Sequence, residues 1–157
     1  THTTASGSFA LCVNRLTEHT LKDIAADTGI DPDINYPIYW GGPVSPSTIW
    51  MLHSSEWSSK GTVLINDKWA MTSNIEMFKS LSLGECPQYF RLMMGHCSWA
   101  PGQLEMELAG QGPWRPHHSW LVTKNPGPAW VLDQEDRLLW ETSTTLCSHQ
   151  AVDSWFN

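Results

Sequence analysis

The stretch over residues 88–110 constrains the fold more than any other part of the chain. Residues 88–94 alternate two sets of large side chains with a period of two, which predicts a strand buried on at least one face. Pro101 suits the first position of a helix, where its missing N–H is not needed, and Gly110 suits a helix end. We therefore predict a strand, a tight turn and a short helix that begins at Pro101.

The predicted turn has three interpretations. A helix start can hold an anion, but Pro101 removes one donor and no lysine follows as in a phosphate-binding loop. Gly95 followed by Cys97 is similar to a turn that presents a hydrolase nucleophile, although Trp99 stands where the second glycine is needed. The interpretation we favour is a packing corner, in which Trp99 fills the core and Gly95 and Gly102 allow close approach of the backbone.

Short strands and short helices interleave along the rest of the chain. Alternating patterns and turn residues predict strands over residues 9–13, 36–40, 49–53, 61–66, 120–123 and 130–132. Capping residues predict helices that follow Thr20, Ser73 and Asp133. Because the connections do not keep a regular βαβ rhythm, the chain predicts an α+β fold with a mostly antiparallel sheet.

Three short signals refine this prediction. Gly41-Gly42-Pro43 is expected to form a tight turn between two strands rather than a ligand loop. Pro37 makes the strand before that turn an edge strand or an irregular one. The helix after Ser73 is expected to carry Ile75 inward.

The length of 157 residues predicts a single domain over residues 1–157 with a real core. Residues 1–8 are polar and are expected to be a loose lead-in. Residues 148–157 form a tail that ends in Trp155 and Phe156, an aromatic pair that suggests docking.

Composition argues against some functions and favours others. The 9 Lys and Arg against 16 Asp and Glu give a net charge of −7, which argues against direct nucleic-acid binding because that binding depends on basic side chains. Three prolines and a Gly-Gly pair in residues 34–55 exclude a membrane helix there. The 10 tryptophans exceed what one small core needs, and tryptophan is enriched at binding interfaces. One of them, Trp114, lies in an aromatic and basic loop over residues 111–118.

The cysteines and histidines predict no metal site. The four cysteines form neither a zinc spacing nor a disulfide framework, so they favour a reducing compartment. His96, His117 and His118 could bind a metal only if the fold brought them together, and solvated loop histidines are the favoured interpretation.

Several motifs together resemble those of the AlgH/YqgE family. The family's N-R pair, its G-G-P-V motif followed by L-H, and its N-S-W-L motif are similar to residues 14–15, 41–44 with 52–53, and 119–121. Its G-Y-A-G-W-G-P-G-Q-L-E-x-E signature is similar to residues 95–107, which read His-Cys-Ser where the family has Tyr-Ala-Gly. The matching positions that we take as candidate interaction residues are Asn14, Arg15, Gly41, Gly42, Pro43, Gly95, Trp99, Pro101, Gly102, Gln103 and Glu105.

The resemblance covers residues 7–142. It has implications for the fold, for the cellular compartment and for a strand that the family has before the start of this chain. It implies an α+β fold with a bent, partly closed, mostly antiparallel sheet flanked by short helices. The family begins with a further segment that contains a strand, and this chain starts after it, so we expect either that the chain is processed or trimmed or that its sheet lacks an edge partner. Family members occur in bacteria and in plastid-bearing eukaryotes, which implies the bacterial cytoplasm or a plastid.

The sequence shows no paired carboxylates, nucleotide fingerprint or metal spacing, so we predict no cofactor and no enzyme activity. The prediction is a protein-interaction module, an accessory or scaffold subunit that docks on a larger assembly of other protein subunits. One alternative is a transcriptional regulator that acts through protein contacts, which is the role that the resemblance implies. A third hypothesis is a cysteine-dependent enzyme that uses Cys97. A chain that spans no membrane is expected in every case.

Overall fold

The computed structural model describes residues 2–3, 6–26, 30, 35–111, 120–124 and 126–153. Its strands are β1 (His2–Thr3), β2 (Gly7–Ala10), β3 (Leu16–Thr20), β4 (Pro37–Trp40), β5 (Val44–Ser54), β6 (Val63–Leu64), β7 (Trp69–Thr72) and β8 (Phe90–Trp99). Its helices are α1 (Leu21–Ala25), α2 (Glu76–Ser82), α3 (Gln103–Leu108), α4 (Pro128–Leu132) and α5 (Asp136–Asp153).

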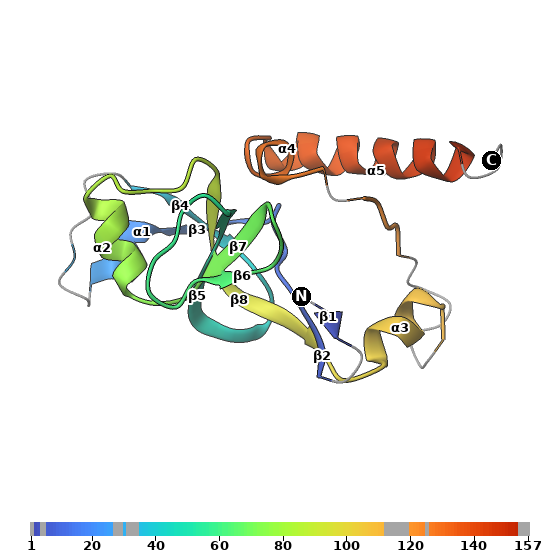
Figure 1. The fold of residues 1–157 in the computed structure, drawn as a ribbon, viewed down its shortest axis with the longest axis horizontal. Helices are drawn as coiled ribbons and strands as arrows, with labels where there is room; N and C mark the ends of the chain where they lie inside the picture. Colours follow the sequence, from blue (N-terminus) through green and yellow to red (C-terminus); the bar gives the residue numbers. More distant parts are fainter. Residues whose placement is uncertain are drawn as a thin grey trace.

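The strands form one open, mixed sheet with β8 at its centre (Figure 1). One edge of β8 pairs with β5 in antiparallel orientation, and the path continues through β7 to β6. The other edge pairs first with β4, in parallel, and then with β2, in antiparallel orientation. Since β4–β8 is the one parallel pair among the described strands, the predicted α+β fold with a mostly antiparallel sheet is confirmed.

The core lies on the face of the sheet that α1 and α2 cover. Its fully or nearly fully buried side chains come from both helices and from three strands, and they are Leu21, Ile38, Ile49, Met51, Met77, Phe78, Leu81 and Leu92. The other face of the sheet carries α4 and the beginning of α5, where Leu132 and Leu139 are buried. In Figure 1 the rest of α5 extends away from the sheet.

The predicted turn after residue 94 is wrong, because β8 continues to Trp99. Gly95 stays in the strand with a φ of +69°, a backbone conformation that glycine adopts without a steric cost. The chain turns instead at residues 100–102, and α3 begins at Gln103, two residues after the predicted start at Pro101. Gly102 has a φ of +77°, and no atom lies within 4 Å of the place that a Cβ would take there, so it serves the turn and not a close approach.

Several other predictions for the first half of the chain need correction. The lead-in over residues 1–8 contains β1 and the start of β2, so it is partly ordered. The strand expected over residues 9–13 ends at Ala10, and β3 and β7 were not predicted. Of the two forms expected for the strand that begins at Pro37, the edge strand is wrong, because β4 lies between β3 and β8, whereas its pairing with β3 is irregular. Pro37 is its first residue, a position that proline tolerates in a sheet interior.

The C-terminal third also differs from the prediction. Residues 120–123 form no strand, and the strand expected over 130–132 lies within helix α4. The last helix is much longer than expected and takes in residues 148–153 of the predicted tail. Trp114, Trp155 and Phe156 lie outside the described residues.

The helix caps were predicted in part. Thr20 precedes α1 as expected, and the Asp23 carboxylate accepts hydrogen bonds from its N–H and its hydroxyl, both at 2.7 Å. At α2 the predicted capping box at Ser73 is wrong, because the N-cap is Ile75 and no side chain caps it. The Asn74 side-chain oxygen accepts from the Glu76 N–H at 3.0 Å just before the helix. Ile75 is 49% exposed and does not face inward.

Candidate functional site

The glycines of two predicted motifs meet where the chain crosses β8. Residues 41–43 connect β4 on one edge of β8 with β5 on the other edge, so they pass directly over β8. A side chain on Gly42 would lie 2.3 Å from the carbonyl carbon of His96, and one on Gly95 would lie 2.2 Å from the carbonyl oxygen of Gly42. The Gly-Gly-Pro motif and Gly95 therefore form one backbone crossing, and the preferred prediction of close backbone approach at Gly95 is confirmed.

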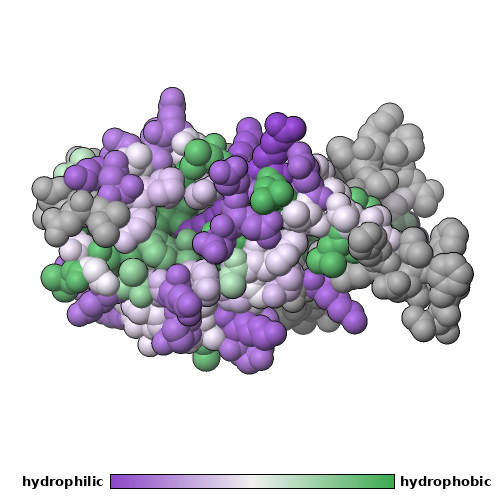
Figure 2. Space-filling view, turned by 90° about the horizontal axis from the view of Figure 1, so that it is seen from above, coloured by the Kyte–Doolittle hydropathy of each residue, from purple (hydrophilic) through white to green (hydrophobic). Residues whose placement is uncertain are grey.

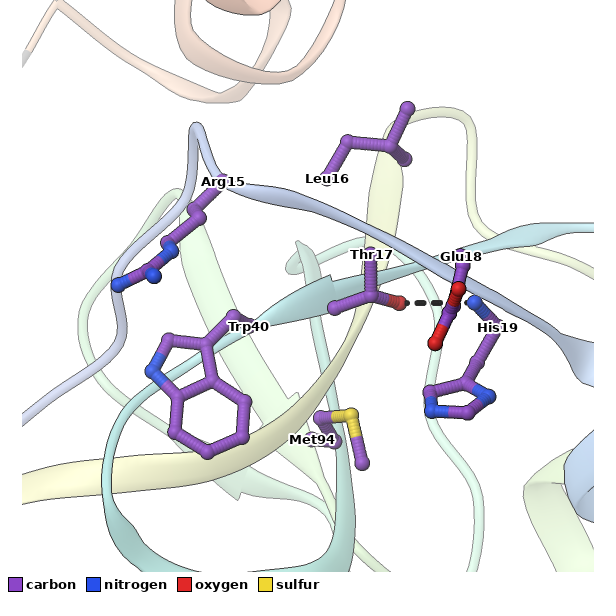
Figure 3. A pocket seen from close by; sticks show the side chains of 7 residues that line it. All are labelled: Arg15, Leu16, Thr17, Glu18, His19, Trp40 and Met94. Carbon is purple, nitrogen blue, oxygen red and sulfur yellow. Dashed lines mark hydrogen bonds between the residues drawn. The ribbon is translucent and has the colours of Figure 1, made fainter.

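A pocket of about 410 Å³ opens beside the crossing, between β3, β4 and β8. We call it the Trp40 pocket; it is lined by Arg15, Leu16, Thr17, Glu18, His19, Trp40 and Met94 (Figure 3). The guanidinium of Arg15 lies at the Trp40 end, and the side chains of Glu18 and His19 lie at the other end. The pocket therefore has a cation at one end and a carboxylate at the other, with the apolar side chains of Trp40 and Met94 between them.

Thr17 holds the wall of the Trp40 pocket in place. Its hydroxyl donates to the carbonyl oxygen of Ile38 at 2.7 Å and accepts from the His19 N–H at 3.2 Å. The first bond ties β3 to β4, and the second fixes the backbone of β3 at His19.

A second cavity, of about 420 Å³, lies between the sheet and the C-terminal helices. We call it the C-terminal groove; its apolar walls include Leu52, Trp69, Trp130, Leu139 and Trp140, and its polar lining includes Asn14, Thr123 and Ser143. A concave, mainly apolar cavity with a few polar groups is the usual form of a binding site.

Large apolar side chains are exposed on the segments that form the groove. On the segment over residues 120–122, which leads to the groove, Trp120 is 44%, Leu121 64% and Val122 71% exposed. On α5, Leu138 is 48% and Trp140 63% exposed. Figure 2, which faces the side of the molecule that carries α4 and α5, shows hydrophobic patches among hydrophilic side chains.

The other predicted site residues do not converge on one site. Asn14 lines the C-terminal groove, whereas Arg15 lines the Trp40 pocket. Trp99 is half-buried and does not fill the core; its ring lies edge-on to Trp120 with centroids 6.0 Å apart. Gln103 caps the turn, because its side-chain oxygen accepts from the Ala100 N–H at 3.0 Å.

The remaining members of the predicted set lie at the surface around these elements. Pro43 and Pro101 are exposed, and Glu105 is half-buried on α3, a helix with no fully buried residue. These positions form a turn and the start of a helix. The signature over residues 95–107 therefore indicates the backbone conformation of this segment more than a binding site.

Cys97 lies in surroundings that disfavour a nucleophile. Burial raises the pKa of its thiol, and the neighbouring Cys12 raises it further, whereas a reactive thiol needs a lowered pKa. The His96 side chain lies on the opposite face of the sheet from that of Cys97, because successive strand residues face opposite sides of a sheet. There it stacks on Phe9, with ring centroids 4.7 Å apart. The neighbour of Cys97 in sequence therefore places no base beside the thiol.

No group of three or more His, Cys, Asp or Glu side chains in the described ranges could hold a metal ion. Of the three histidines weighed from the sequence, His117 and His118 lie outside those ranges. Within the described part of the chain, no helix combines the length and the apolar character that a membrane crossing requires.

Sequence reasoning overlooked Arg91, the main polar link between the sheet and the C-terminal helices. Its guanidinium donates to the Asp136 carboxylate at 2.9 Å and to the carbonyl oxygens of Val13 and Gln134. It also lies 4.5 Å from the centre of the Tyr39 ring. A signal was present, since Arg91 is the one charged residue in the apolar run over 89–94, and a buried charge requires partners.

His53 is a second polar group that the sequence did not single out as a site. Its side chain is fully buried, with Nδ1 2.9 Å from the Ser54 carbonyl oxygen and Nε2 3.0 Å from the Thr72 hydroxyl. Since a carbonyl can only accept, Nδ1 carries the proton in the neutral ring and Nε2 accepts from Thr72. Burial lowers the pKa of His53 below its ordinary value of 6.5.

We expect His53 to make the fold less stable in mild acid. The unfolded chain binds a proton near pH 6.5 while the folded chain resists it, so the contribution of His53 is complete above pH 6.5 and is lost as the pH falls from 6.5 toward the lowered pKa. The slope in that window is at most about 1.4 kcal/mol per pH unit.

Urea unfolding of the wild type and of His53→Gln at pH 7.5, 6.5 and 5.5 measures this slope. The glutamine cannot titrate, so its free energy of unfolding should change less over this range than that of the wild type. Equal slopes for the two proteins would show that His53 is not the titrating group.

Comparison with known proteins places these observations in a family. The sequence model of the AlgH-like family matches residues 1–151. A UPF0301 protein of Sphingopyxis alaskensis is 35% identical over 125 residues, which is 78% of this chain and 58% of that protein. A UPF0301 protein of Nitrosospira multiformis is 32% identical over 139 residues, which is 84% of this chain and 70% of that protein.

A solved structure shares the fold. The solution structure of the AlgH protein from Pseudomonas aeruginosa matches with a TM-score of 0.69 and 25% identity, over 90% of this chain and 74% of that one. This chain spans about six tenths of the length of the Sphingopyxis relative and of one from Gluconobacter oxydans, at 58% and 63%. With the motifs at the crossing and the family match over residues 1–151 in agreement, the chain belongs to the AlgH-like family.

Proposed function

We propose that this chain is a protein-interaction module, an accessory or scaffold subunit that docks on a partner protein through the C-terminal groove and performs no catalysis. The observation that carries the proposal is the concentration of exposed apolar side chains on the segments that form this groove. Trp140 both lines the groove and is 63% exposed. Exposed apolar patches with a polar rim are typical of protein-binding surfaces.

Tryptophans give the groove the composition of an interface. Trp69, Trp130 and Trp140 line it, and tryptophan is among the residues that contribute most to binding energy when a partner covers them. The segment over residues 120–124 belongs to no helix or strand, and the exposed side chains of Leu121 and Val122 are accessible to a partner.

Charge indicates the kind of partner. Asp133 and Glu135 are exposed at the corner between α4 and α5, and the whole chain carries a net charge of −7. A partner with an apolar centre and a basic rim fits such a surface, because complementary charge speeds association and selects the partner. Its binding should weaken as the salt concentration rises.

The test is affinity capture from a lysate of the source organism, with quantitative mass spectrometry and three variants of the full chain. Leu121→Ser and Trp140→Ser remove exposed apolar side chains at the groove. Leu83→Ser makes the same change as Leu121→Ser at a site at the end of α2 that is 73% exposed. We expect a partner captured by the wild type and by Leu83→Ser, and a loss of at least about tenfold with either groove variant.

Two results would contradict the proposal. One is equal capture by all three variants, which would place the contact elsewhere. The other is elution of the wild type as a free monomer from the same lysate, with no protein enriched. The identity of a captured partner separates the two remaining roles, because subunits of the transcription machinery would favour the regulator and a large enzyme assembly the accessory subunit.

A further inference from the structure

We propose that Cys12 and Cys97 form a redox-active thiol pair, which a hydroperoxide oxidises to a disulfide within one chain. This pair is independent of the proposed function, because its chemistry belongs to two side chains and needs no partner. The two residues are 85 positions apart in sequence, and the crossing of residues 41–43 over β8 brings them together.

The backbone of Cys12 and the thiol of Cys97 meet at the carbonyl oxygen of Gly41. The backbone N–H of Cys12 donates to this oxygen at 2.9 Å, and the thiol of Cys97 donates to it at 3.7 Å. The Cys12 nitrogen and the Cys97 sulfur are therefore no farther apart than these two distances combined. Gly41 has no side chain that could separate the two cysteines. A larger residue does not fit at this position, because its Cβ would lie 2.3 Å from the Gly95 oxygen.

The strand register places the residues side by side as well. Ala10 on β2 is the direct partner of Cys97 on β8, and Cys12 follows Ala10 by two residues. In a continuous strand pair such diagonal neighbours lie about 7–8 Å apart between Cα atoms. A disulfide spans about 4.4–6.8 Å, so the bond requires the backbone at Cys12 to move toward β8. Cys12 lies in residues 11–15, which belong to no helix or strand. The backbone movement that the disulfide requires therefore takes place in an irregular segment and breaks no strand pairing.

The electrostatics of the pair agree with this geometry. Burial raises the pKa of the Cys97 thiol, and the neighbouring Cys12 raises it further, since two thiolates repel each other at short range. The Cys12 thiol donates to the side-chain oxygen of Asn14 at 3.6 Å. Both cysteines are half-buried, in contrast to the exposed Cys86.

The oxidation proceeds in two balanced steps. The Cys12 sulfur attacks the terminal oxygen of the hydroperoxide, the O–O bond breaks, and Cys12 becomes a sulfenic acid. The thiol proton goes to the other oxygen, which leaves as water or an alcohol. The Cys97 sulfur then attacks the Cys12 sulfur, a step that its raised pKa slows and that its fixed position in the same chain favours. Its proton goes to the departing hydroxyl, and water leaves as the S–S bond forms. Two electrons pass from the two thiols to the hydroperoxide.

The bond would tie the segment over residues 11–15 to β8. The neighbours of Cys12 in this segment are Val13 and Asn14, which line the C-terminal groove. Val13 also accepts a hydrogen bond from Arg91. Oxidation would therefore fix one wall of the groove in place.

Peptide mapping of the folded full chain tests the pair. Cleavage after Lys and Arg leaves the four cysteines on four different peptides, so every disulfide has its own mass. The chain is treated with hydrogen peroxide, its free thiols are alkylated, and it is digested without reduction. We expect the Cys12–Cys97 peptide pair to exceed any pair with Cys86 or Cys147 by at least about tenfold, because two preplaced thiols react at a high effective concentration.

Variants and an unfolded control make the result decisive. In Cys97→Ser, Cys12 should remain as a sulfenic acid that dimedone traps, whereas Cys86→Ser should leave the Cys12–Cys97 bond unchanged. The bond should become rare when the chain is oxidised in urea. The proposal is overturned if other cysteine pairs dominate, if the bond links two chains, or if it forms equally in urea.

Discussion

Replacement of Gly95 by alanine is expected to prevent stable folding. The new Cβ would lie 2.2 Å from the carbonyl oxygen of Gly42 and 3.1 Å from that of Val44. Both contacts are with backbone atoms, which cannot move aside by a side-chain rotation. We expect a loss of at least about 4 kcal/mol in the free energy of unfolding, a large part of the roughly 5–15 kcal/mol of a typical domain. Urea unfolding followed by tryptophan fluorescence measures it.

Gly84→Ala is the matched control for this substitution. Gly84 has a φ of +75°, close to the +69° of Gly95, but nothing lies within 4 Å of the Cβ that alanine would add. Both variants therefore carry the same cost of a left-handed backbone, about 1–2 kcal/mol, and only Gly95→Ala carries the clash. Similar losses in the two variants would show that the crossing tolerates a methyl group and that its two backbones are not in close contact.

The crossing also explains which parts of the fold could be predicted from the sequence. The alternation over residues 88–94 indicated a strand correctly, because the local side-chain pattern determines it. The Gly-Gly-Pro motif joins two strands as expected, but it crosses over β8 between them and forms no tight turn. Gly95 was expected to allow close backbone approach. Its partner could not be identified, since the contact with Gly42 joins positions that are far apart in the sequence.

The errors follow from long-range pairing. β8 continues past Gly95 because Val44 and residues 8–10 pair with its second half, and those contacts overcome the local signal for a turn. β3 was missed because its burial pattern shows no buried residue, so no apolar alternation marks it. Residues 130–132 are apolar enough for a strand, and only the helix start at Pro128 distinguishes the helix that they form.

The candidate site was less predictable than the fold. Asn14 and Arg15 are neighbours in sequence, yet they line the C-terminal groove and the Trp40 pocket respectively. The groove itself depends on the position of α4 and α5 over the sheet, and the buried side chain of Arg91 links the sheet to that region through Asp136 and Gln134. A sequence pattern shows the charge of Arg91 but not the atoms that receive its hydrogen bonds.

Replacement of Arg91 by methionine is expected to release the C-terminal helices from the sheet. The methionine keeps the apolar length of the side chain but leaves the Asp136 carboxylate and the carbonyl oxygens of Val13 and Gln134 without their donor. Removal of one partner from a fully buried ion pair costs about 3–5 kcal/mol, and the 27% exposure of the Asp136 side chain places the expected cost at the lower end of that range. The free energy of unfolding should fall by this amount, and hydrogen exchange should show lost protection in α4 and α5 while α2 remains protected.

Two further variants separate the hydrogen bonds of Arg91 from its charge. Asp136→Asn keeps both carbonyl partners of Arg91 and should cost less, about 1–2 kcal/mol. Arg137→Met breaks an ion pair with Glu141 at 3.0 Å in which the two side chains are 91% and 56% exposed, and such surface pairs contribute under about 1 kcal/mol. The expected order of destabilisation is therefore Arg91→Met, then Asp136→Asn, then Arg137→Met. If Arg91→Met instead left the protection of α4 and α5 intact, apolar contacts such as those of Leu132 and Leu139 would be sufficient to hold the groove together.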